Sequence, residues 1–322
     1  MRTCLMLLAI IGIGLQPAAA AAAPTWPTET VRVVVPYGAG SATDIVPRVV
    51  FEQLAPQLGQ TVVVENRPGA GGTVGAGFVA TAKPDGYTLL VNSSAHTIAP
   101  ALYRKLSYDP ARDFAAVIPL GISPNVLVVS PAKGFKTVGD LVAAAKAKPG
   151  GLTLASVGVG SATHLSGERF CFSAGVAAVH VPFKGGAEAM AEVMAGRVDF
   201  FFGPVGLVLP QVRAGKLTPL VVSGAERAAA LPNVPTTSEA GFANAEYPIW
   251  FGLFAPAKTP SAVLDSLHDE TLRALQVSRV RDKLSALGVD PLVMTRADFA
   301  TYVKKQFVLN AALVKAIGLK PE

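Results

Sequence analysis

Short runs of β-branched and other apolar residues alternate with helix-like segments along most of the chain. The apolar runs that predict strands cover residues 31–36, 61–65, 87–91, 126–129, 152–156, 177–181, 198–202, 217–223 and 249–255. Helical patterns lie between or after them, at 44–58, 137–148, 187–195, 260–275, 280–287 and 296–316, with a short one ending near residue 82. Strands without polar positions need cover on both faces, as parallel strands have. The alternation therefore predicts an α/β fold with mainly parallel sheets.

Length and composition narrow the class of protein. The 322 residues suit about two domains, and 51% hydrophobic against 16% charged residues excludes a disordered chain. The net charge of +6 is small for this length, and the basic residues are not interleaved with aromatic ones. Nucleic acid is therefore not expected as a partner. Past the N-terminus, no apolar run reaches the roughly 18 residues that a membrane-spanning helix needs.

The N-terminal residues 1–23 have the pattern of a secretory signal peptide. Arg2 precedes an apolar core, and small residues follow up to Ala23. We expect cleavage near Ala23 and export of the remaining chain. Cys171 is then the single cysteine left, so we expect no internal disulfide and a buried thiol.

Small and hydroxyl residues follow four of the predicted strands, at 38–43, 92–95, 158–163 and 202–206. At least two of these segments lead directly into a helix, whose first N–H groups form a ready anion site. With Asp44 as the N-cap, Pro47 would stand third in its helix and cost no hydrogen bond. Each loop alone can be an ordinary βα turn. Two of them, one in each half of the chain, suggest an acid held between domains.

No catalytic, metal or cofactor motif emerges from the sequence. The four histidines have no metal-ligand spacing, and Ser161 with His164 lacks the glycine pattern of a nucleophile elbow. Gly215-Lys216 is followed by Leu217, which excludes a phosphate-binding loop of the Walker type. We predict a protein that is not an enzyme and that carries neither a metal nor a cofactor.

Seven sequence blocks, taken together and in this order, resemble one known family. They are 35–44 (VPYGAGSATD), 64–72 (VENRPGAGG), 84–90 (PDGYTLL), 108–110 (YDP), 181–186 (VPFKGG), 214–217 (AGKL) and 231–236 (LPNVPT). The chain resembles the Bug family, the periplasmic solute-binding receptors of tripartite tricarboxylate transporters. That resemblance implies a two-lobed type II periplasmic-binding-protein fold with the ligand cleft between lobes. It implies lobe I from residues 24–125 and 248–322, and lobe II from residues 126–247.

The resemblance also implies a set of ligand-binding residues in the cleft. From the first lobe they are Tyr37, Gly40, Ser41, Ala42, Thr43, Asp44, Ser93 and Ser94. From the second lobe they are Ser161, Ala162, Thr163, Phe183, Lys184 and Gly203.

Two positions depart from the family pattern. Gly203 stands where amino-acid-binding members carry an aspartate that accepts the ligand's ammonium. Because a buried ammonium without an acceptor is costly, we expect a ligand without an α-amino group, either a dicarboxylic or an aromatic acid. Pro47 replaces a usual alanine, so the capping geometry is expected to shift.

The function implied is periplasmic capture of a small carboxylate by lobe closure. The ligand would pass to a transporter made of one large and one small integral membrane subunit. A different reading is a receptor that signals to a sensor kinase, which begins with the same binding event. A third is a secreted hydrolase that uses Ser161 or Asp44.

Overall fold

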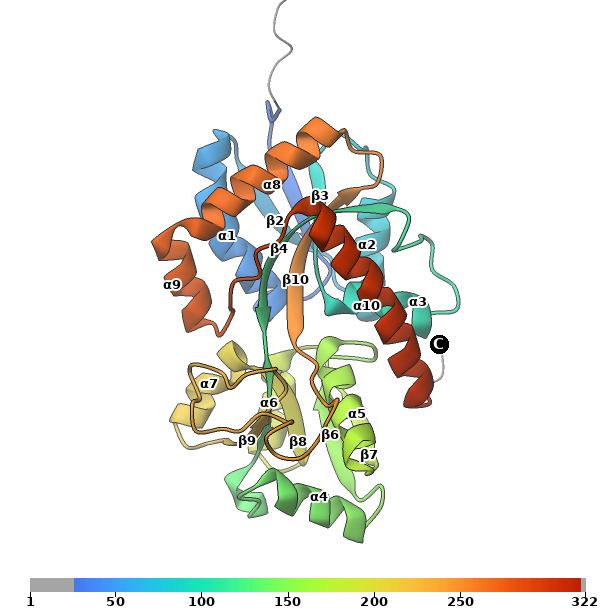
Figure 1. The fold of residues 1–322 in the computed structure, drawn as a ribbon, viewed down its shortest axis with the longest axis vertical. Helices are drawn as coiled ribbons and strands as arrows, with labels where there is room; N and C mark the ends of the chain where they lie inside the picture. Colours follow the sequence, from blue (N-terminus) through green and yellow to red (C-terminus); the bar gives the residue numbers. More distant parts are fainter. Residues whose placement is uncertain (1–25, 320–322) are drawn as a thin grey trace, which may run out of the picture.

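The computed structural model describes residues 26–319, which form two lobes stacked along the long axis of the molecule (Figure 1). The signal peptide predicted for residues 1–23 lies outside these described residues. Each lobe is built on one five-stranded sheet with helices on both faces. Within residues 26–319, no helix is both long enough and apolar enough to span a membrane.

The sheet of lobe I has the strand order β2-β1-β3-β10-β4. Its strands are β1 (Val31–Val35), β2 (Val62–Asn66), β3 (Thr88–Ser93), β4 (Phe114–Ser123) and β10 (Ile249–Pro256). β1 pairs in parallel with β2 and β3, whereas β10 runs antiparallel to both of its neighbours. Four strands therefore share one direction and β10 is reversed.

The sheet of lobe II repeats this arrangement in the order β7-β6-β8-β5-β9. Its strands are β5 (Asn125–Val129), β6 (Leu152–Ser156), β7 (Ala178–Pro182), β8 (Phe200–Pro204) and β9 (Thr218–Val222). Here β5 is the reversed strand, antiparallel to β8 and β9. The predicted fold class, two α/β lobes with mainly parallel strands, is confirmed.

The helices cover the faces and edges of both sheets. They are α1 (Ala42–Leu58), α2 (Thr73–Ala80), α3 (Ala99–Leu102), α4 (Val138–Ala147), α5 (Ala162–Ala174), α6 (Gly186–Met194), α7 (Val205–Arg213), α8 (Ser261–Gln276), α9 (Ser278–Ala286) and α10 (Arg296–Ala316). Short 3-10 turns lie at Ala70–Gly72, Ser94–Thr97 and Pro131–Lys133. The predicted capping box of α4 is present, with Thr137 and Asp140 bonded reciprocally.

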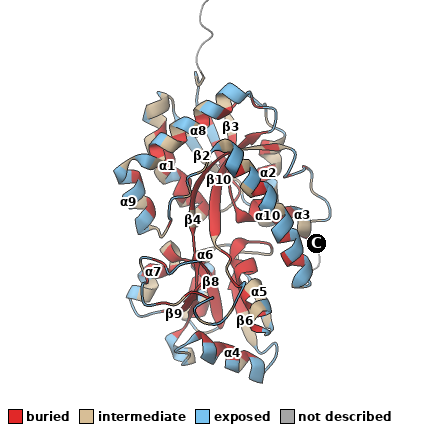
Figure 2. Cartoon of the chain, viewed as in Figure 1, coloured by how far each residue is buried: buried red, intermediate tan, exposed pale blue. Residues whose placement is uncertain are grey.

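Burial on both faces explains why the strands are apolar throughout. In β1, Val33 and Val35 pack into the core beneath α1 and α8, whereas Val34 packs into the opposite core with Phe254 and Phe299. Successive residues of a strand point to opposite faces, so each face needs its own apolar set. Figure 2 shows the result, with buried strands inside and exposed residues on the outer faces of the helices.

The chain changes sheet twice among the described residues, first at Pro124 between β4 and β5, and again between β9 and β10. Asn125 joins the two connections, because its N–H donates to Ser223 Oγ at 3.2 Å and its Nδ2 donates to the carbonyl of Tyr247 at 3.1 Å. These changes of sheet lie beside the predicted lobe boundaries. The exact bounds, residues 24–125 and 248–322 for lobe I and residues 126–247 for lobe II, stay a prediction.

The prediction for the start of α1 was wrong. Ser41, with extended backbone angles, is the N-cap, and the helix begins at Ala42 instead of Asp44. Pro47 is therefore the sixth helical residue, where a missing N–H leaves the carbonyl of Thr43 without its helical donor. Asp44 stands in the first turn, where a negative charge favours the helix dipole.

Candidate functional site

Two loops with the same four residues face each other from the two lobes. Gly40-Ser41-Ala42-Thr43 opens α1 after β1, and Gly160-Ser161-Ala162-Thr163 opens α5 after β6. The loops also share a conformation: both glycines have a positive φ, of 80° and 73°. Ser41 and Ser161 are the N-caps, with φ and ψ of −71° and 157° in one and −68° and 157° in the other. The repeat of four residues is visible in the amino-acid sequence, whereas the prediction of these loops rested on their small and hydroxyl residues alone.

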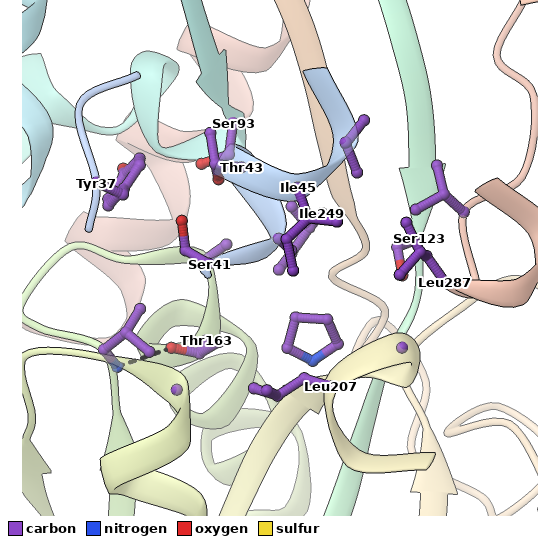
Figure 3. A pocket seen from close by; sticks show the side chains of 18 of the residues that line it. Tyr37, Ser41, Thr43, Ile45, Ser93, Ser123, Thr163, Leu207, Ile249 and Leu287 are labelled. Carbon is purple, nitrogen blue, oxygen red and sulfur yellow. Dashed lines mark hydrogen bonds between the residues drawn. The ribbon is translucent and has the colours of Figure 1, made fainter. Parts of the chain in front are cut away.

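A cavity of about 180 Å³ lies between the lobes at these loops (Figure 3). Nine of the predicted ligand-binding residues line it, namely Tyr37, Gly40, Ser41, Ala42, Thr43, Ser93, Ser161, Ala162 and Thr163. The other lining residues were not predicted: Ile45, Val46, Ser123, Val157, Gly186, Pro204, Gly206, Leu207, Ile249, Leu287 and Val289. Among the lining residues of the described chain, no side chain is charged. A buried anion here would therefore depend on neutral donors.

The first helical turns supply those donors. The opening N–H groups of a helix have no acceptor inside it, and here they belong to Ala42 and Thr43 in α1 and to Ala162 and Thr163 in α5. Each helix end also carries a partial positive charge. Two such ends at one cavity form a place where a carboxylate can accept bonds from both lobes.

The two capping serines differ in a way that points to a ligand. Ser161 Oγ accepts the N–H of His164 at 3.3 Å and donates to the carbonyl of Gly158 at 2.7 Å. Ser41 makes no capping bond, and its buried Oγ has no partner among the described residues. Because Ser41 also lines the cavity, its hydroxyl can donate to a ligand bound there.

Tyr37 and Ser93 complete the hydroxyl-rich part of the lining. The Tyr37 hydroxyl donates to the carbonyl of Gly71 at 3.3 Å, and Ser93 Oγ accepts the N–H of Ala95 at 3.4 Å. Burial raises the pKa of Tyr37 to about 12, which keeps the phenol neutral. In Figure 3, Tyr37, Ser41, Thr43 and Ser93 lie on one side of the cavity, and Thr163 approaches from the other lobe.

Asp44 does not line the cavity and instead fixes the first loop. Its carboxylate accepts the N–H of Gly40 at 2.9 Å, Arg48 Nε at 2.9 Å and Asn66 Nδ2 at 2.8 Å. Burial alone would raise the pKa of Asp44, but these donors outweigh it and hold the pKa below its ordinary value. The ionised carboxylate thus positions Gly40 and the turn that follows it.

Four other predicted residues also lie off the cavity lining. Ser94 is buried behind the end of β3, Phe183 packs against the core of lobe II, and Lys184 is exposed. A β carbon at Gly203 would lie 2.6 Å from Phe201 and from Val208, so a side chain there would enter the core. Gly203 is therefore not a place from which an acceptor could reach the ligand.

Glycines at both flanks of the cavity let the lobes touch. A β carbon on Gly160 of lobe II would lie 2.6 Å from Leu102 of lobe I, and one on Gly71 of lobe I would lie 3.2 Å from the carbonyl of Val159. At the other flank, a β carbon on Gly288 would lie 2.7 Å from Val205 of lobe II. The described structure is therefore the closed form, with the cavity held between the lobes.

The chain forms two α/β lobes joined by two connections, and matched helix N-termini face a closed cavity between them. These features define the class of bilobed solute-binding receptors. The comparisons with known proteins agree. The model of the tripartite tricarboxylate transporter family receptor matches residues 46–319, and the chain belongs to that family. The predicted resemblance to the Bug receptors is thereby confirmed.

Relatives in sequence and in structure cover nearly the whole chain. Protein BugT of Bordetella pertussis is 33% identical over 319 residues, 98% of each chain. Rpa4515 of R. palustris, solved with adipate, has a TM-score of 0.87 and 32% identity over 92% of this chain and 100% of its own. MatC from Rhodopseudomonas palustris, solved with bound malate, has a TM-score of 0.83 and 34% identity over 90% of this chain and 100% of its own.

Proposed function

We propose that this protein captures a small carboxylate without an α-amino group in the periplasm and delivers it to the membrane subunits of a tripartite tricarboxylate-type transporter. The observation that carries the proposal is the pair of matched helix N-termini at one closed, uncharged cavity. Family membership and the adipate and malate bound by two structural neighbours support the same ligand class.

Neutral donors suffice for a useful affinity. A hydrogen bond to a charged group contributes about 1.5–3 kcal/mol, and a helix terminus adds about 0.3–1 kcal/mol. Micromolar binding requires about 8 kcal/mol after the costs of association, which four to six such donors can supply. The N–H groups of Ala42, Thr43, Ala162 and Thr163 with the Ser41 hydroxyl fall in that range. Because no buried ion pair has to be broken, the ligand can also leave.

The lining also supports a ligand without an ammonium group. Gly203 does not line the cavity, and none of the lining residues has a carboxylate to accept ammonium hydrogen bonds. Burying an ammonium without an acceptor is unfavourable by several kcal/mol, on the order of the penalty for a buried unpaired charge. The amine-free form of each acid should therefore bind more tightly than its amino acid.

The hydrolase alternative finds no support in the geometry. Ser161 Oγ donates to the carbonyl of Gly158, and Nδ1 of His164 accepts the N–H of Gly160 at 3.2 Å. Neither group is placed as nucleophile and base for the other. The signalling alternative shares the binding step, and a partner assay with purified membrane subunits or a sensor domain would separate the two.

A calorimetric panel of matched acids tests the proposal. The purified protein is titrated with succinate against aspartate, glutarate against glutamate, and 3-phenylpropanoate against phenylalanine. We expect at least one amine-free acid to bind and each to bind more tightly than its amino partner. Tighter binding of the amino acids would contradict the amine-free ligand, and absence of binding by every carboxylate would contradict the carboxylate receptor.

A further inference from the structure

The repeat that opens α1 and α5 is followed in each lobe by a side chain that accepts the N–H of the repeat's glycine. In lobe I, Asp44 Oδ2 accepts from Gly40 at 2.9 Å. In lobe II, Nδ1 of His164 accepts from Gly160 at 3.2 Å. Both acceptor side chains are buried. His164 therefore holds the loop of lobe II at the same point at which Asp44 holds the loop of lobe I.

The residue one helical turn later is charged in both lobes, with opposite sign. Arg48 Nε donates to Asp44 at 2.9 Å. In lobe II, Glu168 Oε1 lies 3.5 Å from Nε2 of His164, a nitrogen that has no hydrogen bond among the described residues. Because a carboxylate attracts a proton to the nearer ring nitrogen, the neutral imidazole carries its proton on Nε2. Nδ1 is then the acceptor that Gly160 needs.

A second histidine supports the same loop from β7. The ring of His180 stacks on that of His164 with centroids 3.8 Å apart, and its Nε2 lies 2.6 Å from Ser156 Oγ. That hydroxyl accepts the N–H of Gly158 at 3.0 Å. Burial, with the charge of a protonated His164 as the second cause, lowers the pKa of His180 to about 4. Any charge that the stacked pair gains in mild acid therefore lies on His164.

A proton on Nδ1 of His164 would remove the acceptor of the Gly160 N–H and place a donor against a donor. It would also put a positive charge in the first turn of α5, where the helix dipole disfavours it. Gly160 has a φ of 73°, and a β carbon on it would lie 2.6 Å from Leu102 of lobe I. Displacement of this glycine would therefore disturb both the donor loop and the contact between the lobes.

We infer that His164 is a positioning residue of the carboxylate site, that it acts only as the neutral imidazole, and that acid weakens ligand binding by removing this acceptor. The inference rests on the proposed function and adds a pH dependence to it. Glu168 of the same helix and His180 of β7 are the titratable groups that contact His164. β5, β6 and β8, which also pack against α5, carry no titratable side chain.

Two substitutions test the acceptor at neutral pH. His164→Asn carries a side-chain oxygen as Asp44 does in lobe I and does not titrate, whereas His164→Phe keeps a ring against His180 and has no acceptor. The probe is whichever of succinate, glutarate and 3-phenylpropanoate binds the parent protein most tightly. At pH 7.5 we expect H164F to bind it about tenfold more weakly and H164N to stay within about twofold of the parent. Parent-like affinity in H164F, or an H164N variant as weak as H164F, would overturn the inference.

The pH profile of binding separates positioning by the neutral imidazole from a purely structural role, and it does not depend on the folding of H164F. Dissociation constants of the parent and H164N are compared from pH 7.5 to pH 5, and ionisation of the ligand affects both proteins equally. We expect the parent to lose at least about threefold more affinity than H164N over this range. His96→Phe, which removes a buried histidine outside the cavity lining, should keep the loss seen in the parent.

Parallel profiles of the parent and H164N would overturn the inference. So would a parent protein that gains affinity in acid relative to H164N, because the charge of His164 would then attract the ligand. Either result would leave the carboxylate receptor intact. Failure of every acid of the panel to bind the parent at pH 7.5 would contradict the proposed function and the inference with it.

Discussion

Gly206 of α7 lies directly against the backbone carbonyl oxygen of Leu287, and a β carbon on Gly206 would overlap that oxygen. The two residues belong to different lobes, so this close approach exists only when the lobes are closed. Ala162 and Leu165 of α5 likewise pack into the core cluster of lobe I. Small residues at the flanks of the cavity therefore allow the backbones of the two lobes to come into contact when the lobes close.

Substitution Gly206→Ala should therefore weaken ligand binding with little effect on the melting temperature of the ligand-free protein. The added methyl costs about 1–3 kcal/mol where it is forced against backbone, and opening of the lobes relieves that cost when no ligand is bound. Binding by calorimetry and thermal unfolding measure the two effects. Gly139→Ala in α4, whose β carbon meets only ordinary contact at 3.5 Å, is the control. Unchanged affinity in G206A would show that closure does not need this approach.

The unpartnered hydroxyl of Ser41 should matter for binding more than for folding. Ser41→Ala should lower carboxylate affinity by about 1.5–3 kcal/mol, the worth of one hydrogen bond to a charged group. Ser166→Ala is the matched control, because Ser166 Oγ is also buried without a partner among the described residues but does not line the cavity. Equal carboxylate affinities of the two variants would show that the Ser41 hydroxyl does not bind the ligand.

Removing the charge of Asp44 should loosen the first loop. Asp44→Asn loses the carboxylate that accepts hydrogen bonds from Gly40 and Asn66 and pairs with Arg48, and we expect it to cost about 1.5–3 kcal/mol of stability at neutral pH and to weaken ligand binding. Because the folded pKa of Asp44 is depressed, its contribution is present above the ordinary pKa and is lost as pH falls through the folded pKa.

Urea unfolding across pH checks this prediction, and the difference between D44N and the parent protein should shrink in acid. Asp140→Asn, which breaks the capping box of α4 away from the cavity, should lower stability without changing ligand affinity. A D44N variant that binds the ligand normally would contradict the positioning role.

Acid should destabilise the protein through buried His96. The imidazole packs among Phe114, Phe254 and Phe307, and burial lowers its pKa to about 4. The unfolded chain then binds the extra proton between about pH 6.5 and pH 4, so stability is full above this window and falls as pH drops through it, by up to about 1.4 kcal/mol per pH unit. Burial of His180 acts in the same direction.

Replacing His96 by Phe should reduce the dependence of the free energy of unfolding on pH, because a phenyl ring fits the aromatic surroundings and does not titrate. Free energies of unfolding at pH 7, 6, 5 and 4.5 measure the slope in both proteins. A slope as steep in H96F as in the parent would assign the acid sensitivity to other groups.

Local patterns in the sequence predicted most of the elements, because burial on both faces makes the strands continuous in apolar residues. β6 and α10 have the bounds that the pattern predicts, and the capping box of α4 is where Thr137 and Asp140 place it. β4 was missed, because Pro119 and Gly121 interrupt its apolar run. Asp44 was misplaced as the N-cap, since Ser41 and Asp44 both have capping side chains and only the backbone decides between them.

The two loops that open α1 and α5 could be predicted, and the rest of the cavity lining could not. Small residues after a strand and before a helix are a local signal, which singled out the Ser41 and Ser161 loops. Pro204, the last residue of β8, and Gly206, in the first turn of α7, lie in a segment that the same signal marked, although neither was selected. Ile249 and Leu287 follow lobe II in the sequence and are brought to the cavity by sheet pairing and by contact between the lobes. No local sequence pattern predicts either contact.

A crystal structure of the protein with the most tightly bound acid of the panel would show whether the N-termini of α1 and α5 hold the carboxylate. We expect carboxylate oxygens that accept from the N–H groups of Ala42 or Thr43 and of Ala162 or Thr163, with Ser41 Oγ as a further donor. An acid bound with no carboxylate at these two helix ends, or bound outside the interlobe cavity, would contradict this arrangement.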